Sequence, residues 1–106
     1  MAKLSRDKGK RGEREVVEML KAYGFEAHRG QQFRGGSDSP DVIHDIPGVF
    51  IEVKRKETFS LYPALEKAKG EAGGKVPVIF HRRSGKPWVV VLEAEAFLEI
   101  MRIEHV

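Results

Sequence analysis

Residues 40–54 read PDVIHDIPGVFIEVK, which is two extended apolar runs separated by a turn. The turn contains Pro47-Gly48, and proline followed by glycine at the two central positions suits a type II turn. The runs on either side, residues 41–44 and 49–54, have the β-rich composition of strands. We therefore expect these two runs to pair as a hairpin.

The second run alternates in chemistry along its length. A strand places successive side chains on opposite faces, so Ile51 and Val53 should face the core while Glu52 and Lys54 share the other face. The predicted hairpin would bring Asp41 beside Glu52 across the ladder. Two carboxylates with an adjacent ammonium suit a hard divalent cation such as Mg²⁺, which takes one or two carboxylates and fills its remaining positions with water and phosphate oxygens. The alternative reading is a cross-strand ion pair on a solvated sheet face, which is common in a chain with 33% charged residues.

Other elements follow outward from this stretch. Apolar residues recur at three- and four-residue spacings from Gly12 to Tyr23, which predicts an amphipathic helix ended by Gly24. Further patterns predict three strands and two helices, at residues 25–29, 76–81 and 88–92 and at residues 61–72 and 94–103. The order αβββαββα indicates an α/β or α+β fold with one mixed sheet flanked by helices. We expect residues 1–106 to form a single domain, with residues 1–11 as a flexible basic arm.

Composition narrows the functional classes. The 106 residues include 19 Lys plus Arg against 16 Asp plus Glu, a net charge of +3 that permits a polyanionic partner. The absence of cysteine excludes disulfides, thiolate zinc sites and thiol nucleophiles, and favours a cytoplasmic, intracellular protein. No apolar run approaches the length of a transmembrane helix, so no membrane partner is expected.

These residues resemble a known superfamily. Pro40-Asp41, ten intervening residues and Glu52-Val53-Lys54 match the PD-(D/E)xK signature of restriction-endonuclease-like, metal-dependent nucleases. Residues 8–15, KGKRGERE, look like the N-terminal helix of archaeal-type Holliday junction resolvases, and residues 24–41 follow the same group's succession of motifs. Residues 72–88 resemble small phage and prophage nucleases of this superfamily.

The resemblance implies roles for particular residues. Asp41, Glu52 and Glu13 would bind metal together with the backbone carbonyl of Val53, and Lys54 would be the catalytic lysine. The cofactor would be Mg²⁺, with Mn²⁺ as an alternative ion. Basic and polar residues that would contact DNA are Lys8, Lys10, Arg11, Arg29, Arg34, Ser37, Arg55, Lys56, Arg82 and Arg83.

The expected function is a Mg²⁺-dependent DNA endonuclease, a Holliday junction resolvase of bacterial, archaeal or phage origin. Paired incision of a four-way junction needs two active sites, so we expect a homodimer, with Val89 to Leu92 and the helix bearing Phe97, Ile100 and Met101 as candidate contact surfaces. Two alternatives stay open: a nuclease of the same superfamily that acts on flaps, nicks or duplex, and a non-catalytic DNA-binding module.

Overall fold

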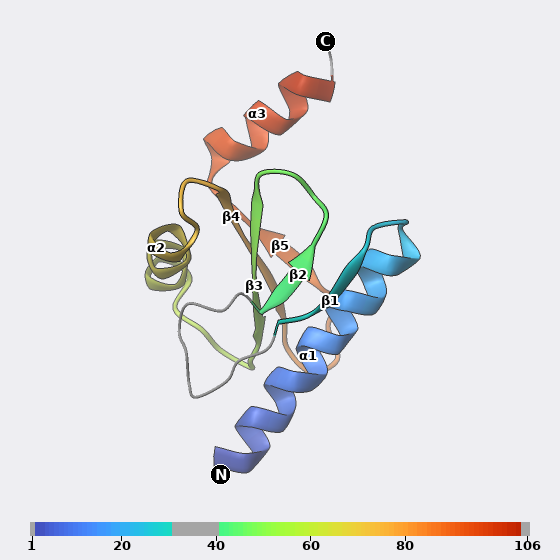
Figure 1. Cartoon of the computed structure of the whole chain (residues 1–106). Helices are drawn as coiled ribbons and strands as arrows, with labels where there is room; N and C mark the ends of the chain where they lie inside the picture. Colours follow the sequence, from blue (N-terminus) through green and yellow to red (C-terminus); the bar gives the residue numbers. More distant parts are fainter. Residues whose placement is uncertain (1, 31–40, 105–106) are drawn as a thin grey trace.

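The computed structural model describes residues 2–30 and 41–104, and its elements follow the predicted order (Figure 1). Three helices and five strands are present in this part of the chain. They are α1 (Ala2–Ala22), β1 (Ala27–Arg29), β2 (Val42–His44), β3 (Val49–Arg55), α2 (Leu61–Glu71), β4 (Val76–Arg82), β5 (Val89–Val91) and α3 (Ala94–Glu104).

Helix α1 is longer than the periodicity predicts. It begins at Ala2, so residues 2–11 are helical where the sequence analysis expects a flexible arm. Lys and Arg, with Ala2 and Leu4, dominate this segment and have good helix propensity, which outweighs Gly9. The helix stops at the predicted place, where Gly24 adopts a positive φ of 91°.

The strands do not pair as the hairpin prediction has it. Strand β2 pairs antiparallel with β1, whereas β3 pairs parallel with β4, and β4 pairs antiparallel with β5. The described strands therefore form a two-stranded sheet and a three-stranded mixed sheet rather than one. The turn at Pro47-Gly48 forms with Gly48 at φ 72°, but a turn only reverses the chain, and both strands find stronger partners elsewhere.

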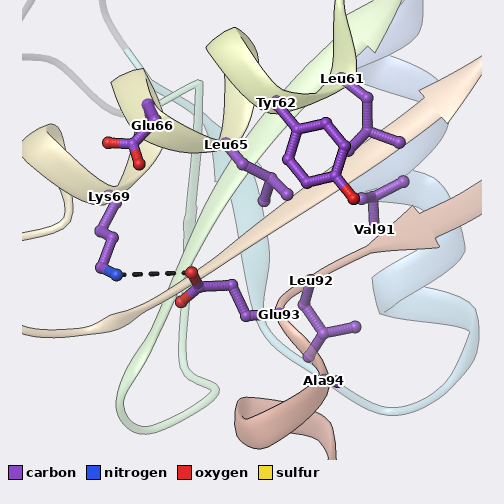
Figure 2. A pocket seen from close by; sticks show the side chains of 9 residues that line it. All are labelled: Leu61, Tyr62, Leu65, Glu66, Lys69, Val91, Leu92, Glu93 and Ala94. Atoms are coloured by element: carbon purple, nitrogen blue, oxygen red, sulfur yellow. Dashed lines mark hydrogen bonds and ion pairs between the residues drawn. The ribbon is translucent and has the colours of Figure 1, made fainter.

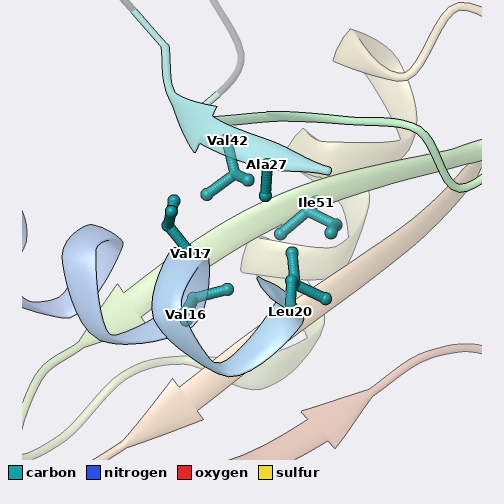
Figure 3. Packing of buried hydrophobic residues seen from close by; sticks show 6 residues of the cluster. All are labelled: Val16, Val17, Leu20, Ala27, Val42 and Ile51. Atoms are coloured by element: carbon teal, nitrogen blue, oxygen red, sulfur yellow. The ribbon is translucent and has the colours of Figure 1, made fainter. Parts of the chain in front are cut away.

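The two faces of the mixed sheet are covered by different helices. Val16, Val17 and Leu20 of α1 pack on Ile51 of β3 in the main buried cluster, together with Ala27 and Val42 (Figure 3). Helix α2 follows β3 and packs on β4, where Ala68 and Ile79 are buried. Such a β3-α2-β4 unit is the usual way to join two parallel strands. It leaves the side chains of Glu52 and Lys54 on the α2 side of the sheet, opposite α1.

Helix α3 extends away from the rest of the molecule (Figure 1). None of its described side chains is fully buried, and Phe97, Leu98 and Met101 are among the exposed large apolar residues. Within the described residues, no helix has the length and apolar character needed to cross a membrane.

Candidate active site

The alternation predicted for β3 is present. Ile51 is buried in the α1 cluster, while Glu52 and Lys54 lie together on the other face with Nζ of Lys54 3.7 Å from Oε1 of Glu52. Their side chains are only 14% and 19% exposed, respectively. The pair is thus largely withdrawn from water, unlike the solvated surface pair of the alternative reading.

Asp41 approaches β3 without a β2–β3 ladder. It immediately precedes β2, and its Oδ2 accepts a hydrogen bond from the backbone N–H of Val53 at 2.8 Å. The N–H and C=O of one residue in an extended strand point to the same side, so the Val53 carbonyl is directed toward the Asp41 edge. The backbone of Asp41 is held in turn by the residue that follows β1, because the Asp41 carbonyl accepts from the N–H of Gly30 at 3.0 Å.

Burial and charge make Glu52 an unusual carboxyl. Loss of solvation, together with the negative charge of Asp41, raises the pKa of Glu52 from 4.5 to about 7 against the opposing effect of Lys54. Two acids that repel each other in a partly dry site can both be ionised when a cation lies between them. Two carboxylates and a carbonyl directed to the same edge form an oxygen donor set of the kind that Mg²⁺ accepts.

Glu13 is held close to this site by α1. Its Oε1 accepts from Nε of Arg29 at 3.1 Å. Burial raises the pKa of Glu13, and Asp41 adds to this effect while Arg29 counteracts it. Among the residues that the structure describes, no group of three acidic, cysteine or histidine side chains is arranged to hold a metal.

The tight contact between α1 and β3 sets the position of Glu13. A Cβ on Gly12 would lie 2.6 Å from Cβ of Arg55 and 3.4 Å from Cγ1 of Val53. The helix can approach the strand this closely only because residue 12 has no side chain.

The predicted DNA-contacting residues fall into three groups. Arg29, Arg55 and Arg82 are engaged within the protein, with Glu13, with Glu57 and Ser84, and with Glu15 and the Lys86 carbonyl. A second group is exposed on α1 or on loops: Lys10, Arg11, Lys56 and Arg83. Lys8 lies in α1 with its side chain undescribed, and Arg34 and Ser37 lie outside the described residues.

Two further features were not predicted from the sequence. Glu15 accepts hydrogen bonds from Nε1 of Trp88, at 2.9 Å, and from Arg82, which fastens the β4–β5 region to α1. The Trp88 ring itself packs against the main buried cluster. The other feature is His81, the register partner of Lys54 on β4. The β3-α2-β4 pattern could have identified it, because parallel neighbours in register share a face.

A mixed sheet between helices, with Asp41, Glu52 and Lys54 at one edge, is the arrangement of the PD-(D/E)xK nucleases. The chain belongs to the archaeal Holliday junction resolvase (Hjc) family, whose sequence model matches residues 4–105. This family membership confirms the predicted resolvase function and the predicted class of metal-dependent endonuclease.

The fold comparison agrees with this membership. The solved structure of Archaeoglobus fulgidus Hjc, a Holliday junction resolvase from an archaeal hyperthermophile, is similar to this chain with a TM-score of 0.60. The two share 21% sequence identity over 77% of this chain and 73% of that one, which supports the mixed α+β fold. No curated protein sequence matches the chain.

Proposed function

We propose that this resolvase hydrolyses DNA phosphodiesters at four-way junctions with Mg²⁺ held by Asp41, Glu52 and the Val53 carbonyl. The observation that carries this proposal is the 2.8 Å contact between Oδ2 of Asp41 and the Val53 N–H, beside the Glu52–Lys54 pair. This contact brings the carboxylate of Asp41 to the strand that carries Glu52. Mn²⁺ would serve as an alternative ion, and a DNA substrate implies an intracellular location.

The side chains around the proposed metal site would then have separate roles in the reaction. The bound cation would supply Lewis-acid activation of water and charge neutralisation at the phosphate. Lys54, whose charge is supported by Glu52, orients the attacking water or stabilises negative charge that develops on phosphorus. Glu13 would complete the acidic side of the site from α1, with Arg29 limiting its repulsion of Asp41. In-line attack that expels the 3′ oxygen leaves 5′-phosphate products.

We propose that the exposed cations bind phosphates around this site. Lys10, Arg11, Lys56 and Arg83 offer their charges to solvent, whereas Arg55 and Arg82 brace loops through carboxylates. Lys8, Arg34 and Ser37 remain candidates from the sequence. Phosphate contacts of this kind position the duplex without reading its sequence.

We propose further that two copies of the chain act together. A groove of about 440 Å³ lies between α2 and the segment from β5 to α3 (Figure 2). Leu61 and Leu65 line it from α2, and Val91 and Leu92 line it from the other side. Helix α3 exposes apolar residues of its own. The occupant that fits the groove is therefore α3 of a second copy, and two-fold symmetry would place α3 of each copy in the groove of the other.

The proposal is tested by incubating the protein with a synthetic four-way junction, a flap and a linear duplex of equal length. Cleavage of the junction at opposed strands in Mg²⁺, and no cleavage in EDTA, is the expected result. Preferential cutting of the flap or the duplex would favour the alternative nuclease. Tight junction binding with no cleavage in Mg²⁺ or Mn²⁺ would favour a non-catalytic binding module.

A further inference from the structure

A second pocket lies next to β3, and of its lining residues only Arg83 is among the exposed cations proposed above to bind DNA. Its volume is about 500 Å³, within the range of sites that enclose small organic ligands. The lining includes Phe59 from the segment after β3, His81 from β4 and Pro87 from the β4–β5 loop. We call it the Phe59 pocket.

The wall of the Phe59 pocket is aromatic. The rings of Phe59 and His81 lie with their centroids 4.2 Å apart and their planes tilted by 46°. Nδ1 of His81 lies 2.9 Å from the Lys54 carbonyl, and since a carbonyl oxygen only accepts, Nδ1 carries the proton. This hydrogen bond fixes the imidazole ring and thereby one side of the pocket.

The rim of the pocket is cationic. Arg83 and Lys86 line it from the β4–β5 loop, and both are exposed. The one acid in the lining is Glu57, and its carboxylate accepts hydrogen bonds from Arg55 and from the backbone and hydroxyl of Ser84. Its charge is therefore balanced locally, and the pocket keeps the positive potential of Arg83 and Lys86.

The Phe59 pocket borders the strand that carries Lys54, because its lining residue His81 lies on the neighbouring strand β4. His81 and Lys54 are register partners on adjacent parallel strands, so their side chains share a face about 4.8 Å apart. A DNA strand that places its scissile phosphate at Lys54 would carry a neighbouring nucleotide past this pocket.

We infer that the Phe59 pocket binds one unstacked nucleotide next to the scissile phosphate, with its base against Phe59 and His81 and its phosphate at Arg83 and Lys86. The inference rests on the proposed function. An apolar aromatic wall with cations at its mouth matches a nucleotide, which has a π-face at one end and an anion at the other. Bases at a branch point lack a continuous stack, so extruding one there costs less than in a duplex. The pocket would thus favour branched DNA over linear duplex.

The test is a double-mutant cycle between one base and Phe59. A four-way junction is prepared with a single abasic site at each nucleotide flanking the branch in turn, and binding is measured by fluorescence anisotropy in Ca²⁺. At one position we expect base removal to weaken wild-type binding about tenfold. Phe59→Leu, which keeps apolar volume, should weaken binding to the intact junction by a similar factor, and the two changes together should cause no further loss.

Controls separate stacking from folding. Phe59→Tyr should restore both the affinity and the sensitivity to base removal, and Tyr23→Leu, at an exposed aromatic beyond α1, should change neither. Additive losses at every branch position, or unchanged affinity in Phe59→Leu, would overturn the pocket assignment. A wild-type protein that does not cleave the intact junction in Mg²⁺ would instead overturn the proposed function, whereas the binding cycle in Ca²⁺ would still test the pocket.

Discussion

Asp41 and Glu52 each carry a negative charge and make a specific contact. Substitution by the corresponding amide removes the charge of each side chain but keeps its shape. In Asp41→Asn the amide oxygen can still accept from the Val53 N–H, and Glu52→Gln keeps the side-chain volume, but both lose a charged metal ligand. We expect Mg²⁺-supported cleavage to fall by at least about 100-fold in either variant, because several kcal/mol of charge stabilisation is removed. Single-turnover cutting measures the loss, and gel shifts in Ca²⁺ should show retained junction binding.

Matched amide variants are available at two other places. Asp45 accepts from the backbone N–H of Glu26 at 3.1 Å, and Glu99 pairs with Arg102 on α3. Asp45→Asn and Glu99→Gln should therefore cut at the wild-type rate. Near-normal cleavage by Asp41→Asn or Glu52→Gln would refute the metal-site assignment.

The raised pKa of Glu52 predicts how stability depends on pH. Its pKa is about 7 in the folded protein against an ordinary value of 4.5, so the folded state holds this proton more tightly than the unfolded chain. Ionisation of Glu52 therefore destabilises the metal-free protein progressively between these two values, and fully above pH 7. Glu52→Gln removes this effect. When the pH rises from 4.5 to 8, the stability of wild type should therefore fall relative to that of the variant by about 3 kcal/mol.

Urea unfolding in EDTA at a series of pH values measures this difference. Subtracting the variant from wild type removes contributions from Glu13 and other groups. Saturating Mg²⁺ should reduce or reverse the difference at pH 8, because only wild type offers the carboxylate to the ion. A variant and wild type with parallel pH profiles would contradict the buried environment of Glu52.

At the scale of elements, the packing of α1 on β3 depends on Gly12. Gly12→Ala places a methyl group 2.6 Å from Cβ of Arg55, a position set closely by the strand backbone, so α1 must move and carry Glu13 with it. We expect a loss of about 1–3 kcal/mol in the free energy of unfolding, which exceeds the gain in helix propensity, together with slower cleavage. Gly9→Ala, in the same helix with nothing within 4 Å, should instead gain about 0.5–1 kcal/mol. Chemical denaturation of the two variants makes the comparison, and equal effects would contradict the close contact.

Local sequence patterns predicted the helices and strands better than they predicted which strands pair with each other. The period of two in β3 correctly separated Ile51 from Glu52 and Lys54, because that alternation is a property of the strand itself. The Pro47-Gly48 turn formed, yet the β2–β3 hairpin was wrong, because pairing depends on competition with the distant strands β1 and β4. Asp41 still reached β3, through its side chain rather than through a ladder.

The ion pairs, like the strand pairing, could not be predicted from the local sequence. The sequence predicts both Arg82 and Arg83 as DNA contacts, and the structure shows that Arg82 also pairs with Glu15, 67 residues away in the chain. Nothing in the local sequence distinguishes a bracing arginine from an exposed one. The helical state of residues 2–11 could have been anticipated from their helix propensity, had their charge not suggested an arm.

At the scale of the whole molecule, we expect substitutions of Arg82 and Arg83 to have different effects on DNA binding. Arg83→Ala removes an exposed cation, so the slope of log affinity against log salt should flatten by about 0.9 for one lost phosphate contact. Arg82→Ala should mainly lower stability, because Glu15 then loses one of the two donors that fasten the β4–β5 region to α1. Arg102→Ala, on α3, gives the control in which the slope stays at the wild-type value. Anisotropy titrations across a salt series measure all three, and an unchanged slope in Arg83→Ala would place the β4–β5 loop away from DNA.

The proposed homodimer gives the last prediction. Phe97, Leu98 and Met101 recur on one face of α3 at helical spacing, and Leu98 is 61% exposed in the single chain. Residues 88–106 carry Arg102 against Glu93, Glu95, Glu99 and Glu104, a net charge of −3, which suits a surface turned away from DNA. Two copies joined here would leave the basic parts of both chains free for the junction.

Wild-type protein at micromolar concentration should therefore sediment at about twice 12.0 kDa and linearise a supercoiled cruciform by two cuts in one binding event. Leu98→Glu places a charge in the interface and should sediment as a monomer that only nicks the cruciform, with its thermal melting otherwise little changed. Tyr23→Glu makes the same kind of change at an exposed residue outside the groove and should remain dimeric. A Leu98→Glu protein that stays dimeric would exclude α3 as the contact. A wild-type protein that is monomeric both free and on the junction would exclude paired incision by a homodimer.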